Sequence, residues 1–428
     1  MPWKNPFING NNYQKTVFSL LALTMVSLAF SVRIVNSLSL ILLVVVTLAH
    51  PYRLKFFKKA FSNPYFIFCL LLYVIKIAGI FYTDHFAESW KQITGKGIWL
   101  AIPFFFCANP SLPQNIFRKL MAYFSISLLV VSLICIAYAI YGYNQQHDPS
   151  VFFYHQLVKP FKHHAVLFSF YLFFCIAYWI ELGIKPKDNK TIRTLVPALI
   201  IYFYLFIFLL SSKLVIIIAL VYLVYATLSA ILKNRMRYGV IVGGLLLITS
   251  LSALLFTNNP IKGRFSDALN GNSFLFKQEK FSPDVYFNGV QLRLLIWRFT
   301  YEILQEKNAW LIGVSTGDAQ PELNRKFAET NVYLGDGSND KLGYRAFNCH
   351  NVFLQTILES GLIGLFFLLA IIGTFLFQAF KKQSHLAIIF FLSMLAFCFT
   401  ESVLSSQYTI LLFMFFPLLS LTTQENEY

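Results

Sequence analysis

The strongest constraint on the fold is a series of long apolar runs that extends from near residue 16 to near residue 423. Each run has about 16 to 25 residues, which lets a helix cross a hydrocarbon core about 30 Å thick. The runs are continuous rather than alternating between apolar and polar residues, so a transmembrane β-barrel is excluded. Because 57% of the residues are hydrophobic and only 13% are charged, the sequence predicts an all-α polytopic membrane protein.

These runs predict about twelve transmembrane helices in one integral-membrane domain. The first run follows Lys4 and Lys15 and so resembles a signal peptide, but no small-residue cleavage site follows it. We therefore expect this helix to be retained. The expected spans cover residues 16–32, 34–50, 64–82, 93–108, 119–142, 164–183, 195–211, 213–232, 239–257, 350–380, 386–402 and 408–423.

The chain is strongly basic, with a formal net charge of +16. Roughly half of the Lys and Arg residues lie in short connections that would all face the cytoplasm if the N-terminus does. We therefore expect both termini in the cytoplasm and residues 258–349 in a large, partly helical loop on the opposite face. The basic excess then reflects topology and attraction to anionic membrane lipids, and nucleic acid is not an expected partner.

The sequence contains no clear set of residues for a metal site or a disulfide framework. Five of the six cysteines fall in apolar runs, which leaves only Cys349 near a boundary. The histidines before the 164–183 span, His155, His163 and His164, are not accompanied by a set of cysteine or acidic ligands with metal-site spacing. We expect no metal and no cofactor.

The long polar segment contains one stretch with helical periodicity, residues 290–306, which carries Arg293 and Arg298. Its apolar positions recur at intervals of three and four residues. A turn-rich cluster follows at residues 313–318. The expected buried face of the helix comprises Leu292, Leu295, Ile296, Phe299 and Ile303.

Several cationic or titratable side chains are expected on the same membrane face as this helix. His350 begins the 350–380 span, and Lys213 occupies the turn before the 213–232 span. Arginine can hold two phosphate oxygens at once, lysine provides a point charge, and neutral imidazole can accept a proton near neutral pH. The group favours an anionic, lipid-borne substrate.

Each of these residues also has a structural interpretation. A histidine at a helix entrance can simply face the interface, Arg293 and Arg298 can be solvated charges, and Lys213 can extend to the membrane surface. Three further ionisable residues lie within or near apolar spans, where charge is costly. They are Lys76, Glu359 and Glu401; the polar series that ends at Glu359, with Asn351 and Gln355, can be a packing contact between helices.

The combined pattern resembles the O-antigen ligase and polymerase superfamily of bacterial envelope glycosyltransferases. His350-Asn351, nine residues, then Gly361-x-x-Gly364 is similar to the histidine signature of that family. Weaker similarities follow in the same order as in the family: residues 79–83 with Lys96 and Pro103, Ser212-Lys213, Arg293 with Trp297, residues 313–318, and Glu401-Ser402. One departure is Lys213, where the family usually has arginine.

This resemblance implies a metal-independent transfer of a glycan from an undecaprenyl-diphosphate carrier to an acceptor hydroxyl at the periplasmic face of the bacterial inner membrane. His350 and Arg293 would be the catalytic residues, and Arg298 and Lys213 would help Arg293 to bind the diphosphate. Asn351, Lys96 and His164 would support them. The acceptor would be the lipid A core for a ligase.

Other functions remain open. A growing glycan would be the acceptor for an O-antigen polymerase, and a protein would be the acceptor for an O-oligosaccharyltransferase; both share the signature. A different class, a transporter or flippase of a lipid-linked or anionic solute, is suggested by the intramembrane residues Lys76 and Glu359. The large polar segment and the lack of two similar halves with Gly- or Pro-interrupted spans favour an enzyme.

Overall fold

The structure is a computed structural model that describes residues 12–183, 190–232, 275–282, 285–335, 343–345 and 347–424. The chain forms two compact units. Unit 1 comprises residues 1–46, 110–266 and 422–428, and unit 2 comprises residues 47–109 and 267–421. The predicted span at 239–257 lies outside the described residues.

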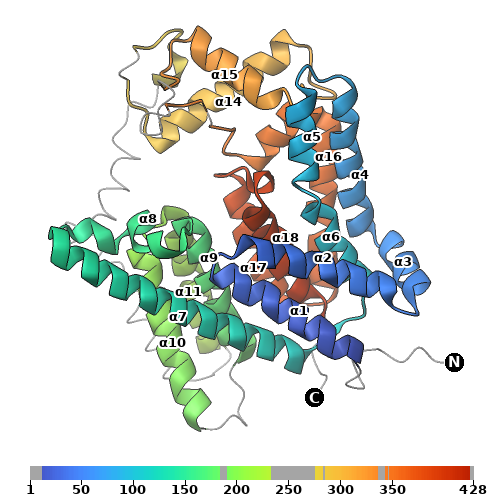
Figure 1. The fold of residues 1–428 in the computed structure, drawn as a ribbon, viewed down its shortest axis with the longest axis vertical. Coiled ribbons are helices and arrows are strands. Elements are labelled where there is room, and N and C mark those ends of the chain that lie inside the picture. Colours follow the sequence, from blue (N-terminus) through green and yellow to red (C-terminus); the bar gives the residue numbers. More distant parts are fainter. Residues whose placement is uncertain are drawn as a thin grey trace. The chain divides into compact units, whose positions relative to one another are not determined.

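Unit 1 is built around the long helix α7, which packs against α1 and α9 (Figure 1). Helix α9 is apolar around its whole circumference and is buried over almost its entire length, and it also contacts α10 and α11. Two short strands pair in parallel beside α7. The elements are α1 (Asn12–Ala29), α2 (Arg33–Ala49), β1 (Leu112–Pro113), α7 (Gln114–Gln146), α8 (Tyr154–Leu157), α9 (Ala165–Tyr178), α10 (Lys190–Leu209), α11 (Lys213–Leu232) and β2 (Thr423–Gln424).

Unit 2 is organised by the pairing of α4 with α16, and by α17 packed on α18 (Figure 1). Helix α6 lies against α4 and α18, while α14 and α15 pack together at one end. The elements are α3 (Arg53–Phe61), α4 (Pro64–Ala78), η1 (Gly79–Phe81), α5 (Phe86–Thr94), α6 (Ile98–Ala108), η5 (Leu275–Lys277), α14 (Gly289–Glu306), α15 (Ala319–Glu329), α16 (Val352–Lys381), α17 (His385–Cys398), η6 (Val403–Ser405) and α18 (Gln407–Leu421).

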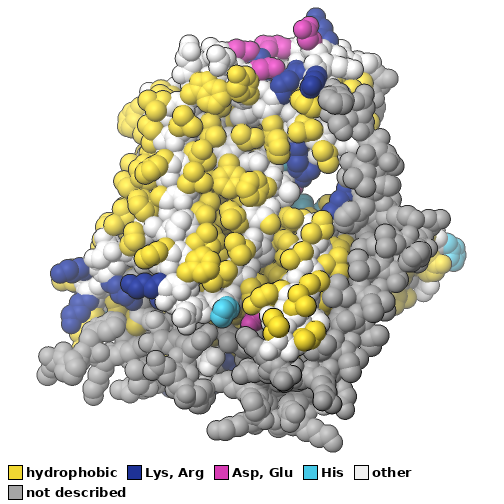
Figure 2. Space-filling view, turned by 180° about the vertical axis from the view of Figure 1, so that it is seen from behind, with side chains coloured by type: hydrophobic (Ala, Val, Ile, Leu, Met, Phe, Trp, Pro, Cys, Tyr) yellow, Lys and Arg dark blue, Asp and Glu magenta, His cyan; other side chains and the backbone are white. Residues whose placement is uncertain are grey.

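Among the described residues, four helices are long and apolar enough to cross a membrane. They are Pro64–Phe81, Gln114–Gln146, Lys213–Leu232 and Val352–Lys381; a fifth is added if α2 and α3, bent by 113°, count as one span. Four shorter apolar helices accompany them. The helical membrane fold is thus present, whereas the count of about twelve spans is not confirmed. Figure 2 shows a broad hydrophobic face with charged side chains near its ends.

The sequence placed most helices correctly but missed three local features. The expected span at 93–108 is interrupted by a turn between α5 and α6, where Gly95 and Gly97 lie. Helix α3 lies in a connection between two expected spans to which no helix was assigned. Helix α15 was also missed, although Ala319, Leu323 and Phe327 recur every four residues and are all buried.

The predicted 350–380 span is broken at Gly361, which has φ 63° and ψ −164°. A segment from the loop between α14 and α15 crosses the break. The amide of Leu362 donates to the carbonyl of Trp310 at 2.8 Å, and the amide of Val314 donates to the carbonyl of Leu358 at 2.8 Å. A Cβ on Gly361 would lie 2.2 Å from the carbonyl carbon of Leu311. Only glycine therefore fits this crossing.

Candidate active site

Three charged or titratable side chains from distant parts of the sequence meet in unit 2. The carboxylate of Glu401 receives a hydrogen bond from Arg293 NH2 at 3.0 Å on one oxygen. Its other oxygen lies 2.9 Å from Nδ1 of His350. These three side chains are each 21 to 31% exposed. The structure thus brings together the two residues predicted to be catalytic and adds a carboxylate between them.

The backbone before α16 holds His350 in a defined position. His350 has φ 45°, in the left-handed region, and its amide donates to Asn348 Oδ1 at 2.9 Å. The indole of Trp297 on α14 donates to the carbonyl of Cys349 at 3.0 Å. A non-glycine residue in this conformation is strained, and such strain persists where surrounding contacts fix it.

Asn351 caps the helix that follows. Its side-chain oxygen accepts the amides of Phe353 at 2.9 Å and Leu354 at 3.1 Å, and its amide group donates to the carbonyl of Phe399 at 3.4 Å. An asparagine at this position satisfies amides that have no partner within the helix. Asn351 therefore sets the start of α16 and joins it to the segment that contains Glu401.

Arg293 is held by the helix that the sequence predicted. Asn288 and Gln291 form a capping box at the start of α14, and all five residues of the expected apolar face are buried. The Arg293 guanidinium donates to the carbonyls of Gly289 at 2.7 Å and Thr400 at 3.1 Å, besides Glu401. A guanidinium has five N–H groups, so two remain to bind an anion after these three contacts.

The Glu401 contact also defines which nitrogen of His350 can act as a base. A neutral imidazole that donates its Nδ1–H to a carboxylate carries its free electron pair on Nε2. The same acid and histidine arrangement orients the base in many hydrolases and transferases. The site can therefore accept a proton at Nε2 while Arg293 binds negative charge beside it.

Glu401 is the functional candidate to which the sequence analysis gave no role. The sequence feature that could have identified it is an ionisable residue at the end of an apolar span, in the pair Glu401-Ser402. Its partners lie 51 residues away at His350 and 108 residues away at Arg293. No local pattern in the sequence connects positions so far apart.

The structure places Arg298 on different contacts. Its NH1 donates to the carbonyls of Phe276 at 2.5 Å and Gln278 at 2.7 Å, and its Nε lies 3.0 Å from Glu302. Five helical steps of about 100° put Arg298 on a face of α14 different from that of Arg293. Its guanidinium joins α14 to η5 and its neighbours, and it is not brought to His350.

Lys213 and His164 belong to unit 1. Lys213 begins α11 directly after Ser211, which has φ 50°, and the buried Ser212. His164 precedes α9, and its ring centroid lies 4.6 Å from that of His155. Their predicted contributions to substrate binding remain predictions. Within the described ranges, no group of three or more potential metal ligands is present.

Asn351, Gln355 and Glu359, which recur every four residues at the start of α16, have three different roles. Asn351 is the helix cap, Gln355 Nε2 donates to Glu359 at 2.8 Å, and Glu359 forms an ion pair with Lys76 of α4. Gln355 Oε1 also accepts the amide of Cys349 at 3.1 Å. A hydrogen-bonded chain thus runs from Lys76 to the residue directly before His350, which makes Glu359 a packing and positioning group.

Part of the chain is similar to a known protein family. No curated protein shows a significant match to the chain. Residues 198–369, which include Lys213, α14 and the His350 to Gly364 signature, match the family model described as O-antigen ligase. This match supports glycan transfer of the O-antigen ligase or polymerase type. Over these residues, the chain is thus similar to the O-antigen ligase family.

Proposed function

We propose that this protein transfers a glycan from an undecaprenyl-diphosphate carrier to an acceptor hydroxyl. The observation that carries the proposal is the Glu401 carboxylate shared by His350 and Arg293. A base and an anion-binding cation are what this reaction needs. The transporter alternative loses support, because the two predicted catalytic residues are joined through one side chain rather than spread along a path.

In the proposed reaction, Nε2 of His350 takes the proton of the acceptor hydroxyl as its oxygen attacks the anomeric carbon of the donor glycan. The bond between that carbon and the diphosphate oxygen breaks, and the diphosphate leaves with the bonding electrons. Arg293 stabilises the charge that develops on the leaving oxygens. Glu401 keeps the imidazole oriented and stabilises it once it is protonated.

Four further residues are assigned supporting roles in this reaction. Lys213 and His164 are proposed to contact the donor, Lys96 to supply positive charge, and Arg298 to stiffen the loop helix that carries Arg293. We further propose about twelve spans, both termini in the cytoplasm and the His350 site at the periplasmic face of the inner membrane. Neither metal ion nor cofactor has a role in this proposal.

The acceptor is proposed to be the lipid A core, as in an O-antigen ligase. A growing glycan or a protein hydroxyl would suit the same site chemistry. A deletion strain distinguishes these acceptors, because loss of long lipopolysaccharide with normal glycoproteins supports the ligase. Unchanged lipopolysaccharide together with lost protein glycosylation would contradict it.

The direct test is reconstitution of the purified full-length protein with a lipid-linked glycan and each candidate acceptor. Wild-type protein should produce glycosylated acceptor and free carrier diphosphate in equal amounts. His350→Ala should abolish both products while the protein still inserts in the membrane. Transfer at the wild-type rate by His350→Ala would remove the base assignment.

A further inference from the structure

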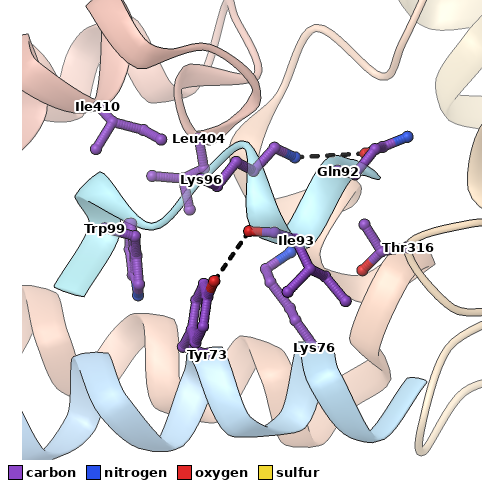
Figure 3. Close-up of a pocket in the computed structure, with 9 residues that line it drawn as sticks. All are labelled: Tyr73, Lys76, Gln92, Ile93, Lys96, Trp99, Thr316, Leu404 and Ile410. Atoms are coloured by element: carbon purple, nitrogen blue, oxygen red, sulfur yellow. Dashed lines mark hydrogen bonds between the residues drawn. The ribbon is translucent and has the colours of Figure 1, made fainter. Parts of the chain in front are cut away.

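The segment that crosses the break in α16, residues 310–314, exposes two large apolar side chains. Leu311 is 62% exposed and Ile312 is 49% exposed. The residues that follow show the opposite pattern, because Ser315 and Thr316 are polar and buried. Figure 3 shows Thr316 at the wall of a cavity between α4 and the α5 to α6 region. A loop in water exposes its polar side chains and buries its apolar ones, so this pattern indicates that Leu311 and Ile312 face an environment other than water.

The exposed pair continues an apolar surface that belongs to α16. Leu362, Ile363 and Phe366 are all exposed on this helix. The amide of Leu362 donates to the carbonyl of Trp310 at 2.8 Å, and the amide of Ile363 donates to the carbonyl of Leu311 at 3.3 Å. These bonds place the crossing segment directly beside the exposed side chains of α16. Because α16 is long and apolar enough to cross a membrane, its exposed apolar side chains face lipid, and Leu311 lies next to them.

The lengths of two helices place the crossing segment at one edge of the hydrocarbon core. After the break, α16 runs from Leu362 to Lys381, about 20 residues, and its length of about 30 Å equals the thickness of that core. The basic Lys381 marks the opposite edge. A second candidate span, Pro64–Phe81, ends at the level of the segment, because the hydroxyl of the next residue, Tyr82, donates to the carbonyl of Ile312 at 2.8 Å.

The backbone of the crossing segment is also suited to contact with lipid. The carbonyls of Trp310, Leu311 and Ile312 all accept hydrogen bonds from within the protein, through the two amides of α16 and the hydroxyl of Tyr82. A carbonyl without such a partner is costly where lipid replaces water. Trp310 has the amphipathic ring that is enriched where proteins meet the membrane surface, and its indole donates to Gln305 at 3.3 Å.

We propose that Leu311 and Ile312 insert into the membrane at the boundary of its hydrocarbon core. Their partner is the acyl-chain region just below the lipid headgroups, whatever the headgroup is. The crossing segment joins α14 to α15, so its insertion attaches this helix pair to the membrane surface. The proposal rests on the helical membrane fold and not on the reaction, and it can fail while the proposed glycan transfer stands.

The test labels single cysteines with a fluorophore in the full-length protein, reconstituted in lipid nanodiscs. All six native cysteines are buried, so the label reports the introduced position. In Leu311→Cys and Ile312→Cys, a lipid that carries a nitroxide on its acyl chain near the headgroup should quench the label, and aqueous iodide should not. Because both native side chains are exposed, each variant should keep the wild-type Tm, and two separate positions guard against damage at one of them.

Two further variants calibrate the quenching. Phe366→Cys is the lipid-facing reference, because Phe366 is 62% exposed and lies one turn beyond Leu362 in α16. Ala328→Cys is the water-facing reference, because Ala328 is exposed on the polar helix α15. Labels at 311 and 312 that respond like the label at 366 support insertion. Quenching by iodide as strong as at 328 would overturn the proposal, and so would protection from both quenchers, which would show that another protein surface, such as a second copy of the chain, covers the segment.

Discussion

Oε2 of Glu401 lies 2.9 Å from Nδ1 of His350, although 51 residues separate them in the sequence. The other oxygen of the same carboxylate accepts from Arg293. A change at Glu401 therefore affects the proposed base and the proposed anion-binding cation together.

Glu401→Gln should lower the rate of glycan transfer by about 10²-fold to 10⁴-fold, because a neutral amide cannot stabilise protonated His350 and can favour the wrong tautomer. The rate would be measured with reconstituted protein over a range of pH. Glu401→Asp keeps the charge and should restore part of the activity. A wild-type rate and pH profile in Glu401→Gln would show that the carboxylate only packs against its neighbours.

Arg293 and Arg298 differ in what a lysine substitution removes. Arg293→Lys loses the planar guanidinium that contacts Glu401 and would hold the diphosphate, so transfer should fall at least about tenfold. Arg298→Lys is the matched change on the same helix. Arg298 contacts the carbonyls of Phe276 and Gln278. Arg298→Lys should therefore lower the Tm and leave the transfer rate within about twofold of the wild-type rate. Equal loss of activity in both variants would instead support a direct role for Arg298.

Gly361→Ala should destabilise the protein strongly, because φ is positive and the new Cβ would meet the backbone of Leu311. Gly373→Ala is a control in the same helix, α16. A Cβ at Gly373 would meet nothing within 4 Å, so this variant should gain about 0.5 to 1 kcal/mol from helix propensity. Thermal unfolding in detergent measures both. A harmless Gly361→Ala would show that α16 can run straight through this position.

Features that depend on residues close together in the sequence could be predicted, whereas features that depend on contacts between distant segments could not. The apolar face of α14 follows from residues within three or four positions of one another, and it was predicted correctly. The break at Gly361 depends on residues 310–314, and Glu401 acquires its partners from α14 and from the segment just before α16. Apolar periodicity predicts which side of a helix is buried, but it does not predict which backbone crosses a glycine or which acid meets a histidine.

The ion pair between Lys76 and Glu359 can be tested by a double-mutant cycle. Lys76→Met or Glu359→Gln alone should destabilise the protein by about 3 to 5 kcal/mol, because each leaves one charge buried without its partner. The double variant should be more stable than the less stable single variant. Additive losses in the unfolding free energy would mean that the two side chains contribute independently.

Asp318 should make stability depend on pH. Burial raises the pKa of its carboxyl, but hydrogen bonds from His85, Ser315 and the amide of Asp84 outweigh burial, so the pKa lies below the ordinary value of 3.8. Its stabilising contribution is therefore complete above about pH 3.8 and is lost as the pH falls through the lowered pKa.

The measurement for Asp318 is the Tm between pH 2.5 and 6. The Tm of the wild-type protein should fall toward pH 2.5. Asp318→Asn should have a lower Tm at pH 6, and its Tm should fall less steeply as the pH is lowered. Glu88→Gln is a control, because the Glu88 side chain is 44% exposed and lies 3.9 Å from Lys91 in a surface ion pair. An unchanged acid limb in Asp318→Asn would show that other carboxyl groups determine it.

The crossing of residues 310–314 through the break in α16 also bears on how the protein is made. The first half of α16 owes its direction to backbone bonds with a segment that is synthesised about 50 residues earlier and lies outside the apolar spans. That segment is therefore already available when α16 is synthesised. A chain that ends between His350 and Glu401 has the imidazole and Arg293 but lacks the carboxylate that joins them, so the site is complete only after residue 401 has been added.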